Sequence, residues 1–151
     1  AKAKVLGFVF NGMTAENSSG YGKYRYRQYG RYGYRRYGYG TFATALAHPT
    51  LFAAIAPISG GNMSWRSSNL KTTPVYAVHG KEDTLVPPVC SELMVNAVNA
   101  TGGKAKLLLL EGQGHNDAID YAYRHTDVIE WLLSMRRTDF TPVPEFCHEC
   151  F

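Results

Sequence analysis

The sequence predicts an α/β fold with a mostly parallel sheet and helices on its faces, and three observations support this fold class. From Thr41 onward, short apolar runs typical of buried strands alternate with helix-length amphipathic segments. Each strand–helix–strand unit is long enough for the crossover that parallel strands require. The chain has 151 residues, 45% hydrophobic and 19% charged, which is enough for one ordinary globular core.

The first forty residues contain one predicted strand and one low-complexity segment. Lys4–Phe10 is a short apolar run that indicates a buried strand, and Asn11-Gly12 ends it as a turn. Tyr21–Gly40 contains eight tyrosines, five glycines and six basic residues, with no aliphatic side chain to bury. Its glycine content disfavours a helix, so we expect a mobile loop.

Beyond residue 40 the expected elements follow one another at short intervals. In order, they are a helix at Thr41–Ala47, a strand at Phe52–Ile58, a polar loop at Ser59–Thr72, a strand at Pro74–Val78, a loop at His79–Pro88, a helix at Val89–Ala100, a strand at Lys106–Leu110, a loop at Glu111–Asn116 and a helix at Val128–Met135. The predicted domain boundaries are 1–12 for the N-terminal strand, 13–40 for the low-complexity loop, 41–137 for the α/β region and 138–151 for the tail.

Composition excludes several classes of protein. No apolar run approaches the roughly 18 residues needed to span a membrane. The net charge of +4 arises from residues 21–40, where six basic residues meet no acid, so it says nothing about the rest of the surface. Three cysteines are too few for a disulfide-stapled fold. The chain starts without Met or a secretory leader, so we expect that a leader was removed or that the chain is a fragment.

Two predicted loops carry side chains suited to acid–base chemistry. Asp83 follows a buried strand, where a carboxylate can orient and stabilise an imidazolium, although Asp in loops commonly caps a turn or a helix instead. His115 lies after the next strand in a glycine-rich loop, where we expect it to be exposed and able to act as a general base, or to be an ordinary surface histidine. Their order along the chain matches the acid and histidine of an α/β-hydrolase triad.

Several short stretches make a resemblance specific. They are Gly38-Tyr39-Gly40-Thr41-Phe42, Ala47-His48-Pro49, the run from Phe52 to Ile58, the run from Pro74 to Gly80, the run from Asp83 to Pro87, Gly114-His115 and Trp131-Leu132-Leu133. On these, residues 38–135 resemble the C-terminal half of an α/β-hydrolase of the carboxylesterase, phospholipase/thioesterase and prolyl-oligopeptidase-like group. The resemblance implies a partial three-layer α/β-hydrolase fold, a small ester or acyl substrate, Asp83 as triad acid and His115 as triad base.

The nucleophile of that family is not found where the resemblance places it. The family needs a serine in a G-x-S-x-G elbow, and counting back from Gly38-Tyr39-Gly40-Thr41 puts this position at Arg35. An arginine stays protonated and cannot attack a carbonyl. Ser59 comes closest among the other serines but follows a different strand. The family's earlier strands and oxyanion loop are also absent, so we expect weak or no serine-hydrolase activity.

A second resemblance concerns the N-terminal part. Ala3–Gly12, followed by the tyrosine cluster, resembles the C-terminal end of bacterial tyrosine autokinases of exopolysaccharide assembly. This resemblance implies phosphorylation of the tyrosines and places a junction near residues 36–40, but no G-x-x-x-x-G-K-[ST] loop is present to bind ATP. The alternative function is therefore a non-enzymatic chain whose tyrosine cluster is a phosphorylation or interaction segment.

The remaining features favour no cofactor. Aromatic, Arg and Gly residues together can bind single-stranded nucleic acid, yet no recognised module surrounds them, so nucleic-acid binding is not favoured. Cys147-His148-Glu149-Cys150 supplies half of a zinc site and the other half is missing, so we expect no metal. A sheet with few strands would have exposed edges, which predicts aggregation or a homo-oligomer unless Lys4–Phe10 pairs with it.

Overall fold

The computed structural model describes residues 39–137, with side chains from Gly40 onward. The predicted strand at Lys4–Phe10, the low-complexity segment up to residue 38 and the tail with Cys147 and Cys150 lie outside the described residues. The described elements are α1 (Tyr39–Ala47), the 3-10 helix η2 (Ser64–Leu70), β1 (Val75–Gly80), α2 (Val89–Ala100), β2 (Ala105–Leu110), α3 (His115–His125) and α4 (Val128–Ser134).

Strands β1 and β2 form a parallel pair at the centre of the molecule. Val75 pairs with Ala105 and Gly80 pairs with Leu110, so both strands end at the same edge. The connection between them is α2, which packs against both strands. A helical crossover is what a parallel pair requires, because a short hairpin can join only antiparallel strands. The predicted parallel α/β arrangement is confirmed.

The expected strand at Phe52–Ile58 is only partly correct. Its second half pairs with β1 in parallel, through bridges from Ile55 to Val75 and from Ile58 to Val78. Backbone hydrogen bonds from Ile55 to Pro74 and from Ser59 to Val78 extend this ladder. Pro57 lies between them and has no N–H to donate, so it interrupts an otherwise regular ladder. The segment therefore acts as a third strand without regular pairing along its whole length.

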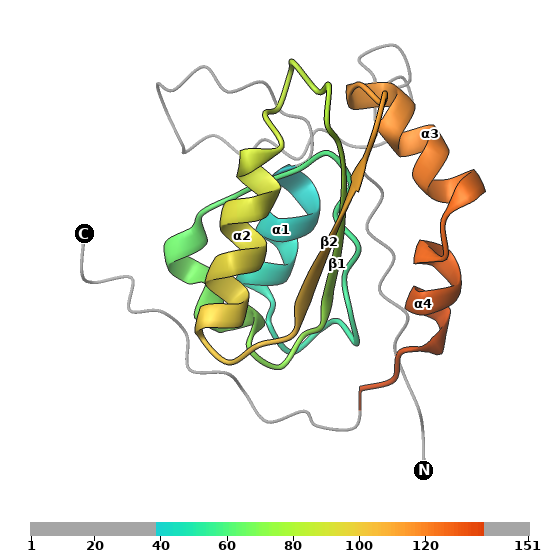
Figure 1. Cartoon of the computed structure of the whole chain (residues 1–151). Coiled ribbons are helices and arrows are strands. Elements are labelled where there is room, and N and C mark those ends of the chain that lie inside the picture. Colours follow the sequence, from blue (N-terminus) through green and yellow to red (C-terminus); the bar gives the residue numbers. More distant parts are fainter. Residues whose placement is uncertain (1–38, 138–151) are drawn as a thin grey trace, which may run out of the picture.

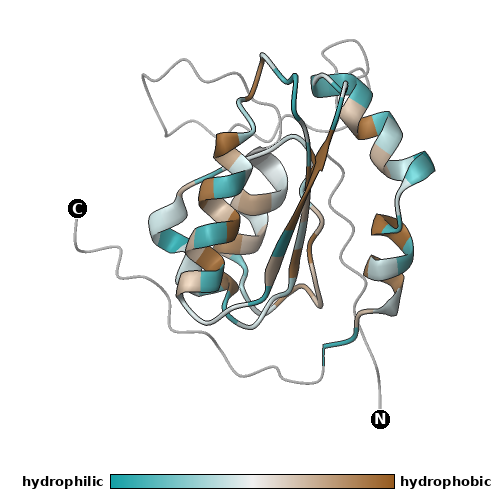
Figure 2. Cartoon of the chain, viewed as in Figure 1, coloured by the Kyte–Doolittle hydropathy of each residue, from teal (hydrophilic) through white to brown (hydrophobic). Residues whose placement is uncertain are grey.

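Helices cover both faces of this sheet, giving three layers. Figure 1 shows α1 and α2 on one face and α3 and α4 on the other. On the first face, one apolar cluster includes Phe42, Leu46, Ile55 and Met94, all at most 2% exposed. On the second face, another cluster includes Tyr76, Ala118, Ala122 and Val128. Figure 2 shows β2 coloured largely hydrophobic between the two layers. The predicted fold class is confirmed, with one core on each side of the sheet.

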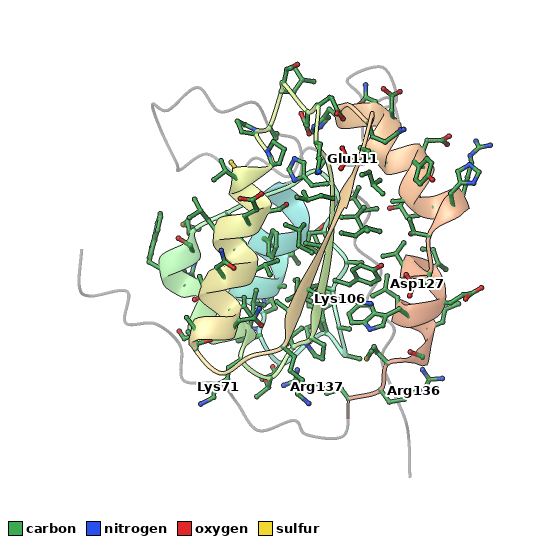
Figure 3. All side chains as sticks on the ribbon, viewed as in Figure 1. Lys71, Lys106, Glu111, Asp127, Arg136 and Arg137 are labelled. Carbon is green, nitrogen blue, oxygen red and sulfur yellow. The ribbon has the colours of Figure 1, made fainter. Side chains whose placement is uncertain are left out.

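An aromatic and ionic group closes the α4 side of the sheet. Lys106 on β2 places its ammonium group 3.5 Å from the ring centroid of Tyr76, which meets Trp131 of α4 edge-on. The Tyr76 hydroxyl donates a hydrogen bond of 2.7 Å to Asp127, just before α4. Figure 3 shows Lys106 and Asp127 on this side of the molecule. These contacts attach α4 to the sheet.

Three further elements differ from the sequence prediction. Strand β1 extends to Gly80, so His79 lies on the strand and not in the expected loop His79–Pro88. The expected polar loop at Ser59–Thr72 contains η2, whose Ser67, Asn69 and Leu70 are buried. Helix α3 was not predicted, and it begins within the expected loop Glu111–Asn116. By contrast, α2 has the predicted bounds, and its Met94, Val95 and Val98 are buried as its apolar spacing indicates. None of the helices between residues 39 and 137 is long and apolar enough to cross a membrane.

Candidate active site

Asp83 lies three residues beyond the end of β1, and its side chain is fully buried. One carboxylate oxygen, Oδ1, accepts hydrogen bonds from the backbone N–H groups of Leu85 (2.9 Å) and Val86 (2.8 Å). The other oxygen, Oδ2, faces two histidine rings. Sequence reasoning left open whether Asp83 closes a turn or meets a histidine, and the carboxylate does both, one with each oxygen.

Gly80 brings the second loop to Asp83. A Cβ atom at this position would lie 2.2 Å from the carbonyl oxygen of Gln113 and 2.7 Å from that of Gly114. Only glycine allows so close a backbone approach. The N–H of Glu82 also donates to the Gln113 carbonyl, at 3.1 Å. The end of β1 and residues 113–114 are therefore packed backbone to backbone, which sets His115 beside Asp83.

His115 is the first residue of α3, and its Nδ1 lies 2.7 Å from Asp83 Oδ2. His115 as a whole is 6% exposed. The expectation of an exposed, movable histidine is therefore wrong. The backbone packing at Gly80 and the start of the helix remove that freedom. The pairing of Asp83 with His115, 32 residues apart in the sequence, is observed directly.

His79 is a second histidine at Asp83, and sequence reasoning did not identify it. It lies on β1, its side chain is 0% exposed, and its Nε2 is 3.2 Å from Asp83 Oδ2. The same nitrogen is 2.9 Å from the Val86 carbonyl, and Nδ1 is 2.7 Å from the Ser91 hydroxyl. The available signal was the position of this ionisable ring at the end of a fully buried strand, where a polar group needs partners.

Ser59 is not arranged as a nucleophile. It is fully buried, and its hydroxyl donates to the backbone carbonyl of His115 at 3.1 Å. Its backbone φ of 51° lies in the left-handed region, where a residue other than glycine is strained by about 1–3 kcal/mol. The hydroxyl thus holds the start of α3 rather than presenting itself to a substrate.

Cys90 is the one cysteine among residues 39–137, and its thiol is also unsuited to act as a nucleophile. Burial, followed by the negative charge of Asp83, raises the pKa of the Cys90 thiol, which keeps it protonated. Among residues 39–137, no group of three or more His, Cys, Asp or Glu side chains is arranged to hold a metal ion. His79 and His115 are both directed at Asp83 instead.

Comparison with known proteins identifies the fold. No family model and no curated protein matches the chain. Among solved structures, a thermostable esterase matches with a TM-score of 0.62 and 30% identity over 66% of this chain. A dienelactone hydrolase-like protein of Klebsiella pneumoniae matches with a TM-score of 0.51 and 19% identity, over 65% of this chain and 48% of its own. A dipeptidyl aminopeptidase IV-like protein of Bacteroides ovatus matches with a TM-score of 0.56 and 14% identity, over 65% of this chain and 18% of its own.

The chain spans only 28% of the length of the thermostable esterase. No comparison shows the resemblance to tyrosine autokinases, which concerns residues outside the described range. The parallel strands, the helices on both faces and the esterase and hydrolase neighbours agree with one another. The described part of this chain is a partial α/β-hydrolase fold.

Proposed function

We propose that residues 41–137 carry the acid–base half of an ester hydrolase site, with His115 as general base and Asp83 as the residue that orients it. The buried hydrogen bond of 2.7 Å between His115 Nδ1 and Asp83 Oδ2 carries this proposal. A carboxylate on Nδ1 fixes the tautomer whose Nε2 accepts a proton, and it stabilises the imidazolium that forms. The 30% identity to a thermostable esterase supports the same chemistry.

The proposed substrates are small carboxylic esters or related acyl compounds. In this reaction Nε2 of His115 takes the proton of an attacking hydroxyl as the new bond to the carbonyl carbon forms. It then returns that proton to the leaving alcohol as the ester bond breaks. We assign no nucleophile and no oxyanion donor among residues 39–137. The hydroxyl of Ser59 donates a hydrogen bond to the His115 carbonyl, which argues against Ser59 as the nucleophile.

The elbow position, by the sequence resemblance, is Arg35, whose guanidinium cannot act as a nucleophile. We therefore expect the chain as it stands to hydrolyse p-nitrophenyl acetate and butyrate no faster than its His115→Ala variant. Faster turnover by the chain than by this variant would contradict the expected lack of activity, and it would require a nucleophilic serine that we have not assigned.

An Arg35→Ser variant tests the base directly. A fluorophosphonate probe labels only an activated serine, so we expect labelling of Arg35→Ser and none of the unmodified chain. Adding His115→Ala to Arg35→Ser should abolish the labelling. Equal labelling with and without His115 would rule out its role as the base. No labelling of Arg35→Ser would rule out residue 35 as the nucleophile position.

A further inference from the structure

A buried chain of polar side chains extends from His115 through Asp83 to the opposite side of the site. Beyond Asp83 it continues through the His79 ring to the Ser91 hydroxyl at the start of α2, and from there to the Gly60 carbonyl. The side chains of Asp83 and His79 are 0% exposed, and Ser91 is fully buried. Gly61 keeps this end closed, since a Cβ there would lie 2.5 Å from Cys90 Cβ.

The protons on this chain can be assigned from its acceptors. A serine hydroxyl has one proton, and the Gly60 carbonyl can only accept, so Ser91 donates its proton to Gly60. The Ser91 oxygen can then only accept from His79 Nδ1, 2.7 Å away. Nδ1 of His79 therefore carries a proton.

The other ring nitrogen of His79 also faces acceptors alone. Nε2 lies 2.9 Å from the Val86 carbonyl and 3.2 Å from Asp83 Oδ2. A carbonyl and an ionised carboxylate have no proton to offer, so Nε2 must carry one as well. A histidine that donates from both nitrogens is an imidazolium cation, and a buried cation needs an anion beside it. Asp83 is that anion.

The other ionisable groups near this ring do not replace Asp83. Lys81 and Glu82, on the same loop, are exposed, and Lys81 pairs with Glu111 of the neighbouring loop. The Cys90 thiol on α2 is held protonated, because burial and the charge of Asp83 raise its pKa. His115 at the start of α3 is the remaining group, and it shares Oδ2 of Asp83 with His79.

We propose that His79 is a buried imidazolium that positions Asp83 for His115. Two backbone N–H groups donate to Oδ1 and His115 donates to Oδ2, while the His79 ring lies 3.2 Å from Oδ2 as the adjacent charge, so the carboxylate is held against rotation away from His115. His79 acts through Asp83 and does not contact the reacting atoms, so it is a positioning residue. Its catalytic meaning rests on the proposed function, but its charge and hydrogen bonds do not.

Nitrogen-15 NMR of the histidine side chains tests this proposal without any substrate. The chain has five histidines, which single His→Gln variants assign. At pH 7 we expect both nitrogens of His79 to resonate in the protonated range. A His79 nitrogen in the unprotonated range would overturn the proposal, whatever the outcome of the esterase and probe experiments.

The positioning role has a separate readout in the Nδ1 proton of His115. In His79→Phe, which removes the charged ring beside Oδ2, we expect this proton to exchange with water about tenfold faster. His79→Gln, which keeps a donor for Asp83, should restore slower exchange, and it also serves if His79→Phe does not fold. His48→Gln, at an exposed histidine, is the matched control. Unchanged exchange in both His79 variants would rule out the positioning role.

Discussion

Each end of the sheet buries a charged side chain, and these two side chains have different kinds of partners. Asp83, at the carboxyl end, is surrounded by two backbone N–H groups and two imidazole rings. Arg137, at the amino end, is 9% exposed, and its hydrogen-bond partners among residues 39–137 are neutral oxygens. Figure 3 shows Arg137 at the end of the sheet away from Glu111, which follows β2. Two of the partners of Asp83 are imidazole rings, which are general acid–base groups, whereas the partners of Arg137 are carbonyls and hydroxyls.

The surroundings of Arg137 are those of a structural clamp. Its guanidinium donates to the carbonyls of Pro49 and Phe52, at 3.2 and 3.0 Å, and to the hydroxyls of Thr72 and Thr73. Its Nε has no hydrogen-bond partner among the residues that the structure describes. Burial of a charge therefore does not by itself identify a site of chemistry, and the imidazole rings beside Asp83 distinguish the carboxyl end from the amino end.

Removal of Asp83 should have the largest effect. Asp83→Ala leaves two backbone N–H groups and the His115 ring without their acceptor and the buried His79 ring without its adjacent carboxylate, which costs about 3–5 kcal/mol in the free energy of unfolding. Urea unfolding followed by tryptophan fluorescence measures this change. Glu82→Ala, at the exposed acid next to it, should change stability by less than about 0.5 kcal/mol. Similar values for the two variants would contradict the buried network.

Arg137→Ala tests the other end of the comparison. It leaves the Pro49 and Phe52 carbonyls without their donor, so we expect a loss of about 2–3 kcal/mol. The neighbouring Arg136 is exposed and donates to the carbonyls of Leu133 and Met135, so Arg136→Ala should cost less than about 0.5 kcal/mol. Equal losses in the two variants would mean that Arg137 is not a clamp.

Gly80→Ala separates geometry from charge at the carboxyl end. The added methyl group collides with the backbone of residues 113–114, so we expect a loss of about 1–3 kcal/mol and a weaker His115–Asp83 hydrogen bond. Urea unfolding and the NMR signal of the His115 Nδ1 proton measure the two effects. Gly40→Ala has open space within 4 Å and should be neutral or stabilising. An unchanged His115 signal in Gly80→Ala would contradict the role of this close approach.

The smallest expected effect on stability concerns Tyr76, which lies on β1 between the two ends of the sheet. Burial, with the hydrogen bond and charge of Asp127, raises the pKa of Tyr76 to about 12 from 10.0. Because the folded pKa exceeds the unfolded one, this stabilisation is fully present below pH 10 and is lost as pH rises through 12. We expect about 1 kcal/mol, less than the full shift implies, because Asp127 is exposed to screening solvent. Urea unfolding between pH 9 and about 12 should show this loss, and Tyr76→Phe should remove it.

Strong periodicity made some elements predictable from the sequence. Helix α2 has an apolar stripe and two glycines at its end, and its predicted bounds are those observed. Helix α3 buries only His115 and two alanines, and such small side chains leave little periodic signal. The strand containing Pro57 was predicted as regular from its apolar residues alone, although the proline, which has no N–H, was the signal that one hydrogen bond of the ladder is missing.

The site was predictable in its residues more than in its environment. Asp83 and His115 were identified from their order after successive strands, which place both at one edge of the sheet. The burial of His115 depends on the contact of Gly80 with residues 113–114, over 30 positions away, and nothing local encodes it. His79 was missed because its partners, Asp83, Val86 and Ser91, become neighbours only when the loop folds back.

The Arg137 clamp also constrains the order in which this region can be completed during synthesis. Its guanidinium bonds residues that precede it by 88 and 85 positions. A ribosome therefore releases Pro49 and Phe52 long before their donor exists, and those carbonyls remain hydrated until Arg137 emerges. Contacts of such sequence separation form slowly, because loop closure must precede them. The apolar cluster on the first face, whose residues lie between Phe42 and Ala105, can assemble before Arg137 emerges, whereas the amino end of the sheet closes only afterwards.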